Sequence, residues 1–187
     1  MESGGSAPIL TLEPLIDAIR GAAEAAGWEL SGLQKTTSHQ FEGRWEGDST
    51  RSAYLFFHHP AAPDEVSVDI YLDETSRGLS GNLALVVDLR PLGLLGAPSA
   101  ALSALATASA ERIPDRYRRP VTLRFRLADA GEPVADAESE VRFKVRLPRA
   151  VISAGSDAVG EFTRSVVVDF SSLLDAEVLD ALRDTGL

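Results

Sequence analysis

Apolar and polar residues alternate strictly over residues 66–73, which predicts a β-strand with one buried and one accessible face. Val66, Val68, Ile70 and Leu72 fall on one face, and Ser67, Asp69, Tyr71 and Asp73 fall on the other. Similar but less regular stretches predict four further strands before residue 90, at residues 28–37, 40–46, 52–58 and 79–89. Glycine, proline, serine and aspartate residues between these stretches are typical of turns.

Three more strands are predicted later in the chain, at residues 121–127, 141–147 and 162–170. A helix is predicted at residues 11–27, where apolar residues recur at a spacing of three and four and Gly27 ends the pattern. A second helix is predicted from about residue 98 to residue 113, and a short third helix after Ser172. Pro114 stops the second helix.

Runs of strands between helices favour the α+β class. We therefore expect a mainly antiparallel sheet in the order helix, strand meander, helix, three strands, helix, with the helices packed on one face of the sheet. Residues 1–10 contain Gly4, Gly5, Ser6 and Pro8 and are expected to form a flexible leader. Residues 11–187 are expected to form a single domain, since this length suits one hydrophobic core.

Charge is distributed unevenly along the chain. The formal net charge is −10, which argues against binding to nucleic acid or to an anionic membrane. Residues 112–149 nevertheless carry ten basic residues against six acidic ones. The longest uncharged run, residues 91–110, contains Pro98 and is too weakly apolar to span a membrane. We therefore expect a protein without a membrane-spanning segment.

The basic residues within the strands predicted at 121–127 and 141–147 alternate with apolar ones. If these strands pair antiparallel, one face of the sheet carries five cations: Arg124, Arg126, Arg142, Lys144 and Arg146. Their mutual repulsion requires an offset. One alternative is ion pairing with acidic residues of neighbouring strands, for which Asp69, Asp73 and Asp169 are the candidates. The other is a binding site for an acidic or phosphate-bearing partner, which arginine suits because its guanidinium binds carboxylate and phosphate through two hydrogen bonds.

Other candidate chemistry is sparse. The histidines are His39, His58 and His59, and neighbouring strand residues point to opposite faces, so His58 and His59 are read as a strand-end pair and not as metal ligands. An enzyme that uses His58 or His59 remains an alternative. The sequence contains no cysteine, which favours a reducing compartment such as the cytoplasm. No phosphate loop, dinucleotide fingerprint or nucleophile elbow is present, so no cofactor, metal or catalytic residue is predicted.

Six of the twelve aromatic residues precede position 60, and these six are expected to pack in the core and between hairpins. Phe41 and Trp45 are the exceptions considered, because they share a strand face with Gly43 and are alternatives for an exposed recognition surface.

The order of the elements and the acidity of the chain resemble secretion-chaperone-like and YbjN-like domains, although this chain has additional strands. The resemblance implies a homodimer that holds a partner protein along an exposed sheet or helix surface. We therefore expect a non-catalytic protein-binding module of the adaptor or chaperone type. The alternative is a regulatory domain that recognises an anion or phosphate through the arginine-rich sheet face.

Overall fold

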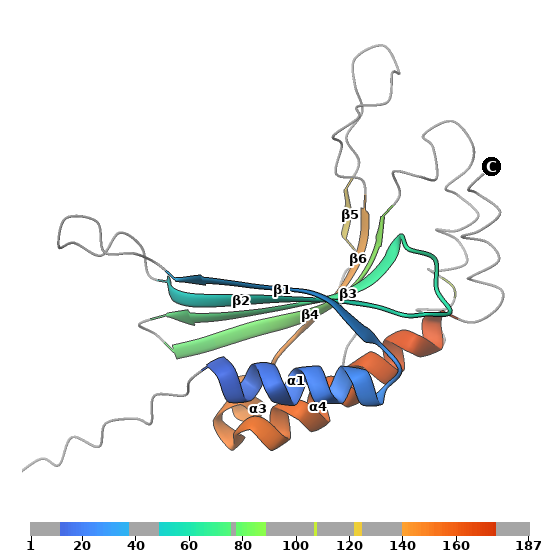
Figure 1. Cartoon of the computed structure of the whole chain (residues 1–187). Coiled ribbons are helices and arrows are strands. Elements are labelled where there is room, and N and C mark those ends of the chain that lie inside the picture. Colours follow the sequence, from blue (N-terminus) through green and yellow to red (C-terminus); the bar gives the residue numbers. More distant parts are fainter. Residues whose placement is uncertain are drawn as a thin grey trace, which may run out of the picture.

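The computed structural model describes residues 12–37, 49–75, 78–88, 107, 122–124 and 140–174. These residues form two layers, an antiparallel sheet and a layer of helices that all lie on one side of it (Figure 1). The strands are β1 (Glu29–Thr37), β2 (Ser49–His58), β3 (Val66–Thr75), β4 (Gly78–Asp88), β5 (Thr122–Arg124) and β6 (Glu140–Arg146). The helices are α1 (Leu12–Ala25), α3 (Arg149–Ala154) and α4 (Ser156–Leu173). The predicted α+β class, with a mainly antiparallel sheet and helices on one face, is confirmed.

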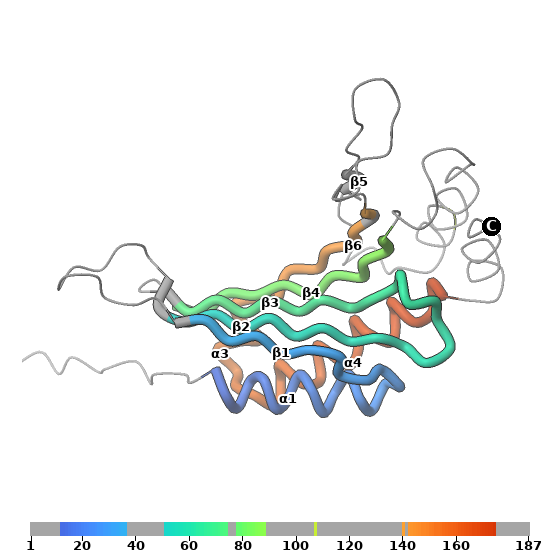
Figure 2. Tube along the Cα trace, turned by 45° about the horizontal axis from the view of Figure 1, so that its top comes forward, coloured from blue at the N-terminus to red at the C-terminus, as the bar shows by residue number. Residues whose placement is uncertain are grey.

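The strands lie in the order β1-β2-β3-β4-β6-β5, and every neighbouring pair is antiparallel. The first four strands therefore form the predicted meander, and β6 joins β4 from far along the chain. Leu123 of β5 pairs with Val141 of β6, so the two basic strands are adjacent as the alternation predicted. Figure 2 shows the meander running side by side above α1 and α4.

The hydrophobic core lies between the sheet and the helices. Strands β2, β3, β4 and β6 contribute the apolar half of their alternating patterns, and the four core residues of β3 are at most 1% exposed. Helix α1 contributes residues spaced three and four apart, including Leu12, Leu15 and Ile19. Trp28, directly after α1, is 1% exposed, and its indole Nε1 donates a hydrogen bond to Ser171 Oγ of α4 at 2.9 Å. The residue directly after α1 thus contacts α4, the last described helix, within the core.

The strand predicted at residues 162–170 is wrong, because these residues form the middle of α4. The run of β-branched residues from Val166 to Val168 suggested a strand, but such propensities are weak beside packing. Val159, Val166 and Phe170 are buried, whereas Val168 is 50% exposed. Burial therefore follows the helical period, and packing against α1 and the sheet outweighs the local preference.

The helix start predicted at Ser172 is also wrong. Ser172 lies in the last turn of α4, and its Oγ donates a hydrogen bond to Asp169 O at 2.6 Å. The strand predicted at residues 40–46 and the body of the helix predicted at residues 98–113 fall outside the described residues, although Thr107 is helical. The leader at residues 1–10 and the chain after residue 174 also fall outside them.

Candidate binding face of the sheet

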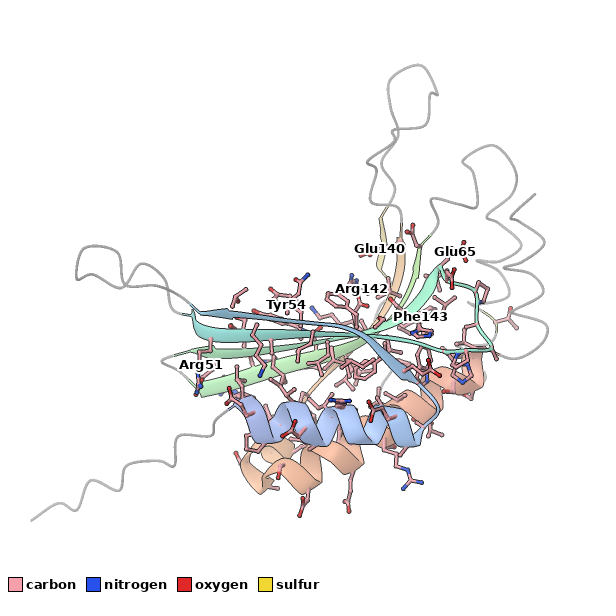
Figure 3. The ribbon with its side chains drawn as sticks, viewed as in Figure 1. Arg51, Tyr54, Glu65, Glu140, Arg142 and Phe143 are labelled. Atoms are coloured by element: carbon pink, nitrogen blue, oxygen red, sulfur yellow. The ribbon has the colours of Figure 1, made fainter. Side chains whose placement is uncertain are left out.

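The open face is the side of the sheet that points away from α1, α3 and α4. In β3 the residues of the open face are half-buried, while their neighbours in the chain are fully buried in the core. The same alternation places Tyr54 and Phe56 of β2 on the open face, because the residues between and beside them belong to the core. Figure 3 shows Tyr54 and Arg142 standing on this side of the sheet.

Strand register arranges the open-face residues in rows that cross the strands, because residues paired between neighbouring strands share a face. One row consists of Gln34, Tyr54, Tyr71, Asn82 and Arg146. The next row consists of Gly32, Phe56, Asp69, Ala84 and Lys144. The first row therefore leads from the aromatic residues Tyr54 on β2 and Tyr71 on β3 to Arg146 on β6, and the second leads from Phe56 on β2 through Asp69 on β3 to Lys144 on β6.

The aromatic patch consists of Tyr54, Phe56 and Tyr71. The rings of Tyr54 and Tyr71 lie 4.6 Å apart between centroids, with an angle of 38° between their planes. Tyr54 is 38% exposed. Phe56 lies over Gly32, where a Cβ would stand 3.3 Å from its ring. Burial raises the pKa of Tyr71 above its ordinary value, and the nearby Asp73 also raises it.

Arg142 is neutralised by two carboxylates. Its Nε and Nη2 donate hydrogen bonds to Glu140 at 3.0 and 3.2 Å, and Nη2 lies 3.5 Å from Asp69 Oδ2. Asp69 also accepts a hydrogen bond from Ser67 Oγ at 2.8 Å. Burial raises the pKa of Asp69 above its ordinary value, although the Ser67 hydrogen bond and the charge of Arg142 act in the opposite direction. For Arg142, therefore, the predicted ion pairing with Asp69 is present.

Asp73 and Asp169, the other two acidic residues expected to pair with the cations, lie in different parts of the structure. Asp73 accepts a hydrogen bond from Ser52 Oγ at 2.8 Å. Asp169 lies in α4, in the helix layer, and not in a strand beside the cations.

Lys144 and Arg146 differ from Arg142. Both are exposed on the open face of β6, where Lys144 lies beside Ala84 and Arg146 beside Asn82. Within the described part of the chain, neither side chain has a carboxylate at ion-pairing distance. The open face thus carries two cations without an acidic partner among these residues.

Three of the five predicted binding residues share the open face, namely Arg142, Lys144 and Arg146. The backbone of Arg124 lies in β5 opposite Glu140, but its side chain is not among the described ones, and Arg126 lies outside the described residues. The repulsion expected among these cations is relieved at Arg142 by Asp69 and Glu140.

The sequence reasoning missed the aromatic residues of this face. It expected the early aromatic residues to pack in the core and between hairpins, and Trp28 and Phe57 lie in the core. Tyr54 packs against Tyr71 of the neighbouring strand and Phe56 lies over Gly32, both on the open face, which was not foreseen as a site. The alternation of Tyr54 and Phe56 with buried Ala53, Leu55 and Phe57 was the available signal. Phe41 and Trp45 lie outside the described residues.

His58 and His59 have separate surroundings, and His39 lies outside the described residues. His58 Nε2 lies 3.3 Å from Glu29 Oε2, whereas the His59 ring meets the Trp28 ring edge-on at 5.2 Å. His59 Nδ1 accepts a hydrogen bond from the backbone N–H of Ala61 at 3.2 Å. Among the described residues, no group of three or more histidine, aspartate or glutamate side chains is arranged to hold a metal ion.

Comparison with known proteins gives no relative: no family model, no curated protein and no solved structure matches this chain. Of the helices that are described, none has the length and apolar character needed to cross a membrane.

Proposed function

We propose that this protein is a non-catalytic protein-binding module and that the open face is its recognition surface. The observation that supports this proposal is the patch of Tyr54, Phe56 and Tyr71 on the same open face as Lys144 and Arg146, two cations that have no carboxylate partner among the described residues. Tyrosine and arginine are enriched at the centres of protein interfaces, where they contribute much of the binding energy.

The apolar surface that each face of the sheet leaves accessible also favours the open face as the recognition surface. On the helix side, the apolar residues of β2, β3, β4 and β6 are already buried in the core, so these strands offer little apolar surface there to a partner. On the open face, Tyr54 keeps more than a third of its surface accessible. Covering aromatic surface contributes about 25 cal/mol for each Å² removed from water. A partner that covers this patch therefore gains apolar contact without disturbing the fold.

A peptide-display experiment tests the proposal. Random peptides are selected on the immobilised full-length protein, and the enriched peptides are then measured against Tyr54→Ser and against Val168→Ser by fluorescence anisotropy. Val168 is a matched control, because it is exposed and apolar but lies on α4. We expect Tyr54→Ser to weaken binding at least about fivefold, since truncation of a central interface residue costs more than 1 kcal/mol. Peptides that lose affinity for Val168→Ser and not for Tyr54→Ser would overturn the proposal.

A second candidate function is recognition of a free anion or phosphate group. It is favoured by the exposure of Lys144 and Arg146 and by the neutralisation of Arg142, which leaves the positive charge at one end of the open face. Titration with inorganic phosphate, followed by the NMR signals of the two side chains, tests it. Saturable shifts that disappear in Arg146→Ala support this candidate, and shifts that do not saturate contradict it.

Homodimer formation is also proposed, with β1 as the contact. Among the described strands β1 pairs only with β2, and Leu33 on it is 41% exposed. A two-fold axis at Leu33 would pair β1 with the β1 of a second copy and bury this residue. Analytical ultracentrifugation of the wild type and of Leu33→Lys tests the dimer: a concentration-dependent dimer that the variant lacks is expected, and a monomeric wild type contradicts it. A cytoplasmic location is proposed as well, which the absence of cysteine supports.

A further inference from the structure

We propose that the segment bound by the open face is an extended acidic peptide in which an apolar or aromatic residue lies four positions from an acidic residue. This inference rests on the proposed function and adds the chemistry of the partner. It follows from three features of the open face: the row that joins Tyr54 to Arg146, the charge at the β6 end, and the acidic residues that flank the row.

The row fixes the spacing. Neighbouring strands lie about 4.8 Å apart, so Tyr71 and Arg146 are separated by about 10 Å and Tyr54 and Arg146 by about 14 Å across the sheet. An extended peptide advances about 3.3 Å per residue, and its side chains alternate between two sides. Residues four positions apart therefore lie on the same side and about 13 Å apart. When an apolar side chain of the peptide packs on Tyr54 and Tyr71, an acidic side chain four positions further along the peptide lies at Arg146.

The charge at the β6 end selects an acidic residue. Arg142 is already satisfied by Asp69 and Glu140, whereas Lys144 and Arg146 have no carboxylate partner among the described residues. A carboxylate can accept two hydrogen bonds from the arginine guanidinium, which fixes its orientation. Complementary charge of this kind mainly raises specificity and the rate of association.

The same face disfavours a nucleic acid. Bases stack on exposed aromatic rings, but the affinity of such complexes depends on the neutralisation of several phosphates. Only Lys144 and Arg146 are available for this on the described open face, and the carboxylates of Asp69 and Asp73 lie beside the aromatic patch. A peptide with one or two acidic residues matches this number of charges, and a polyphosphate backbone does not.

The test uses the peptides selected by display, synthesised with a fluorescent label. We expect the selected sequences to contain an acidic residue four positions from an apolar or aromatic one. We expect the double charge reversal Lys144→Glu with Arg146→Glu to weaken binding at least about tenfold. Replacing the acidic residue of the peptide by lysine should restore affinity for this double variant, which a merely structural role of the two cations would not explain. Arg20→Glu with Arg164→Glu, two exposed changes on α1 and α4, is the control for net charge, because it alters the charge by the same amount.

The outcomes separate the two proposals. Peptides that depend on Tyr54 but contain no acidic residue, and that bind the charge-reversed protein as well as the wild type, overturn this inference and leave the proposed function standing. Selected peptides whose binding does not depend on Tyr54 overturn both. A labelled twelve-residue oligothymidylate that binds the wild type more tightly than every selected peptide, and that loses this affinity in Tyr54→Ser, also overturns the peptide assignment.

Discussion

Thr163 offers a sharp test of how α4 packs. Its side chain is 0% exposed, and its Oγ1 has no hydrogen-bond partner in the described part of the chain. It lies in the layer between α4 and α1, where a Cβ at Gly160 would stand 3.4 Å from Ala18 O. A buried hydroxyl without a partner costs about 1–3 kcal/mol of stability. Thr163→Val replaces the hydroxyl by a methyl group of the same shape and should remove this cost.

We expect Thr163→Val to stabilise the protein by about 1 kcal/mol, the lower end of that range, which corresponds to a rise in Tm of about 2–4 °C for a chain of this size. Thr163→Ser is the matched control, because it keeps the hydroxyl, removes the methyl group and should destabilise by about 1 kcal/mol. Urea denaturation followed by circular dichroism measures both changes. A valine variant that unfolds at lower urea than the wild type would show that the hydroxyl is hydrogen-bonded, and the reasoning would be refuted.

Three further predictions concern the core and the open face. Trp28→Phe removes the hydrogen bond to Ser171 and leaves a cavity, so it should destabilise by about 2 kcal/mol in urea denaturation, and an unchanged midpoint would contradict this packing. Phe143→Ala should destabilise the protein by about 3–5 kcal/mol, because Phe143 points into the core. Lys144→Ala should change the stability by less than about 0.5 kcal/mol, because Lys144 is exposed. Similar losses of stability in both variants would contradict the assignment of these residues to opposite faces of β6. Burial raises the pKa of Asp69 above its ordinary value of 3.8. Above the folded-state pKa, the ionised carboxylate therefore lowers the stability of the protein. This loss of stability disappears as the pH falls through the folded-state pKa towards 3.8. The stability of the wild type relative to Asp69→Asn should therefore increase between pH 7 and pH 4, and a relative stability that stays constant or falls would refute the sign.

The local pattern of the sequence predicted much of the sheet, because the cause of a half-buried strand is visible in the strand itself. Residues 66–73 alternate without exception, and β3 buries one half of them. Alternation in residues 141–147 likewise placed Arg142, Lys144 and Arg146 on one face. Such predictions need no knowledge of distant residues.

The errors arose where distant residues decide the structure. The β-branched run in α4 has a local preference for strand, and only packing against α1 and the sheet makes it helical. The rows of the open face depend on the pairing of β4 with β6, two strands separated by more than fifty residues. The sequence contains Tyr54 and Arg146 but not the register that aligns them, so the combined aromatic and cationic surface was not predictable.

The central claim is that partners bind the open face, and site-specific photocrosslinking tests it most directly. A photoreactive phenylalanine analogue is placed at position 54 in one protein and at position 168 in another, and each is irradiated with the strongest selected peptide. Both positions are exposed, one on the open face and one on α4. Crosslinking from position 54 with none from position 168 is the predicted result. Crosslinking from position 168 alone would place the binding surface on the helices and contradict the account.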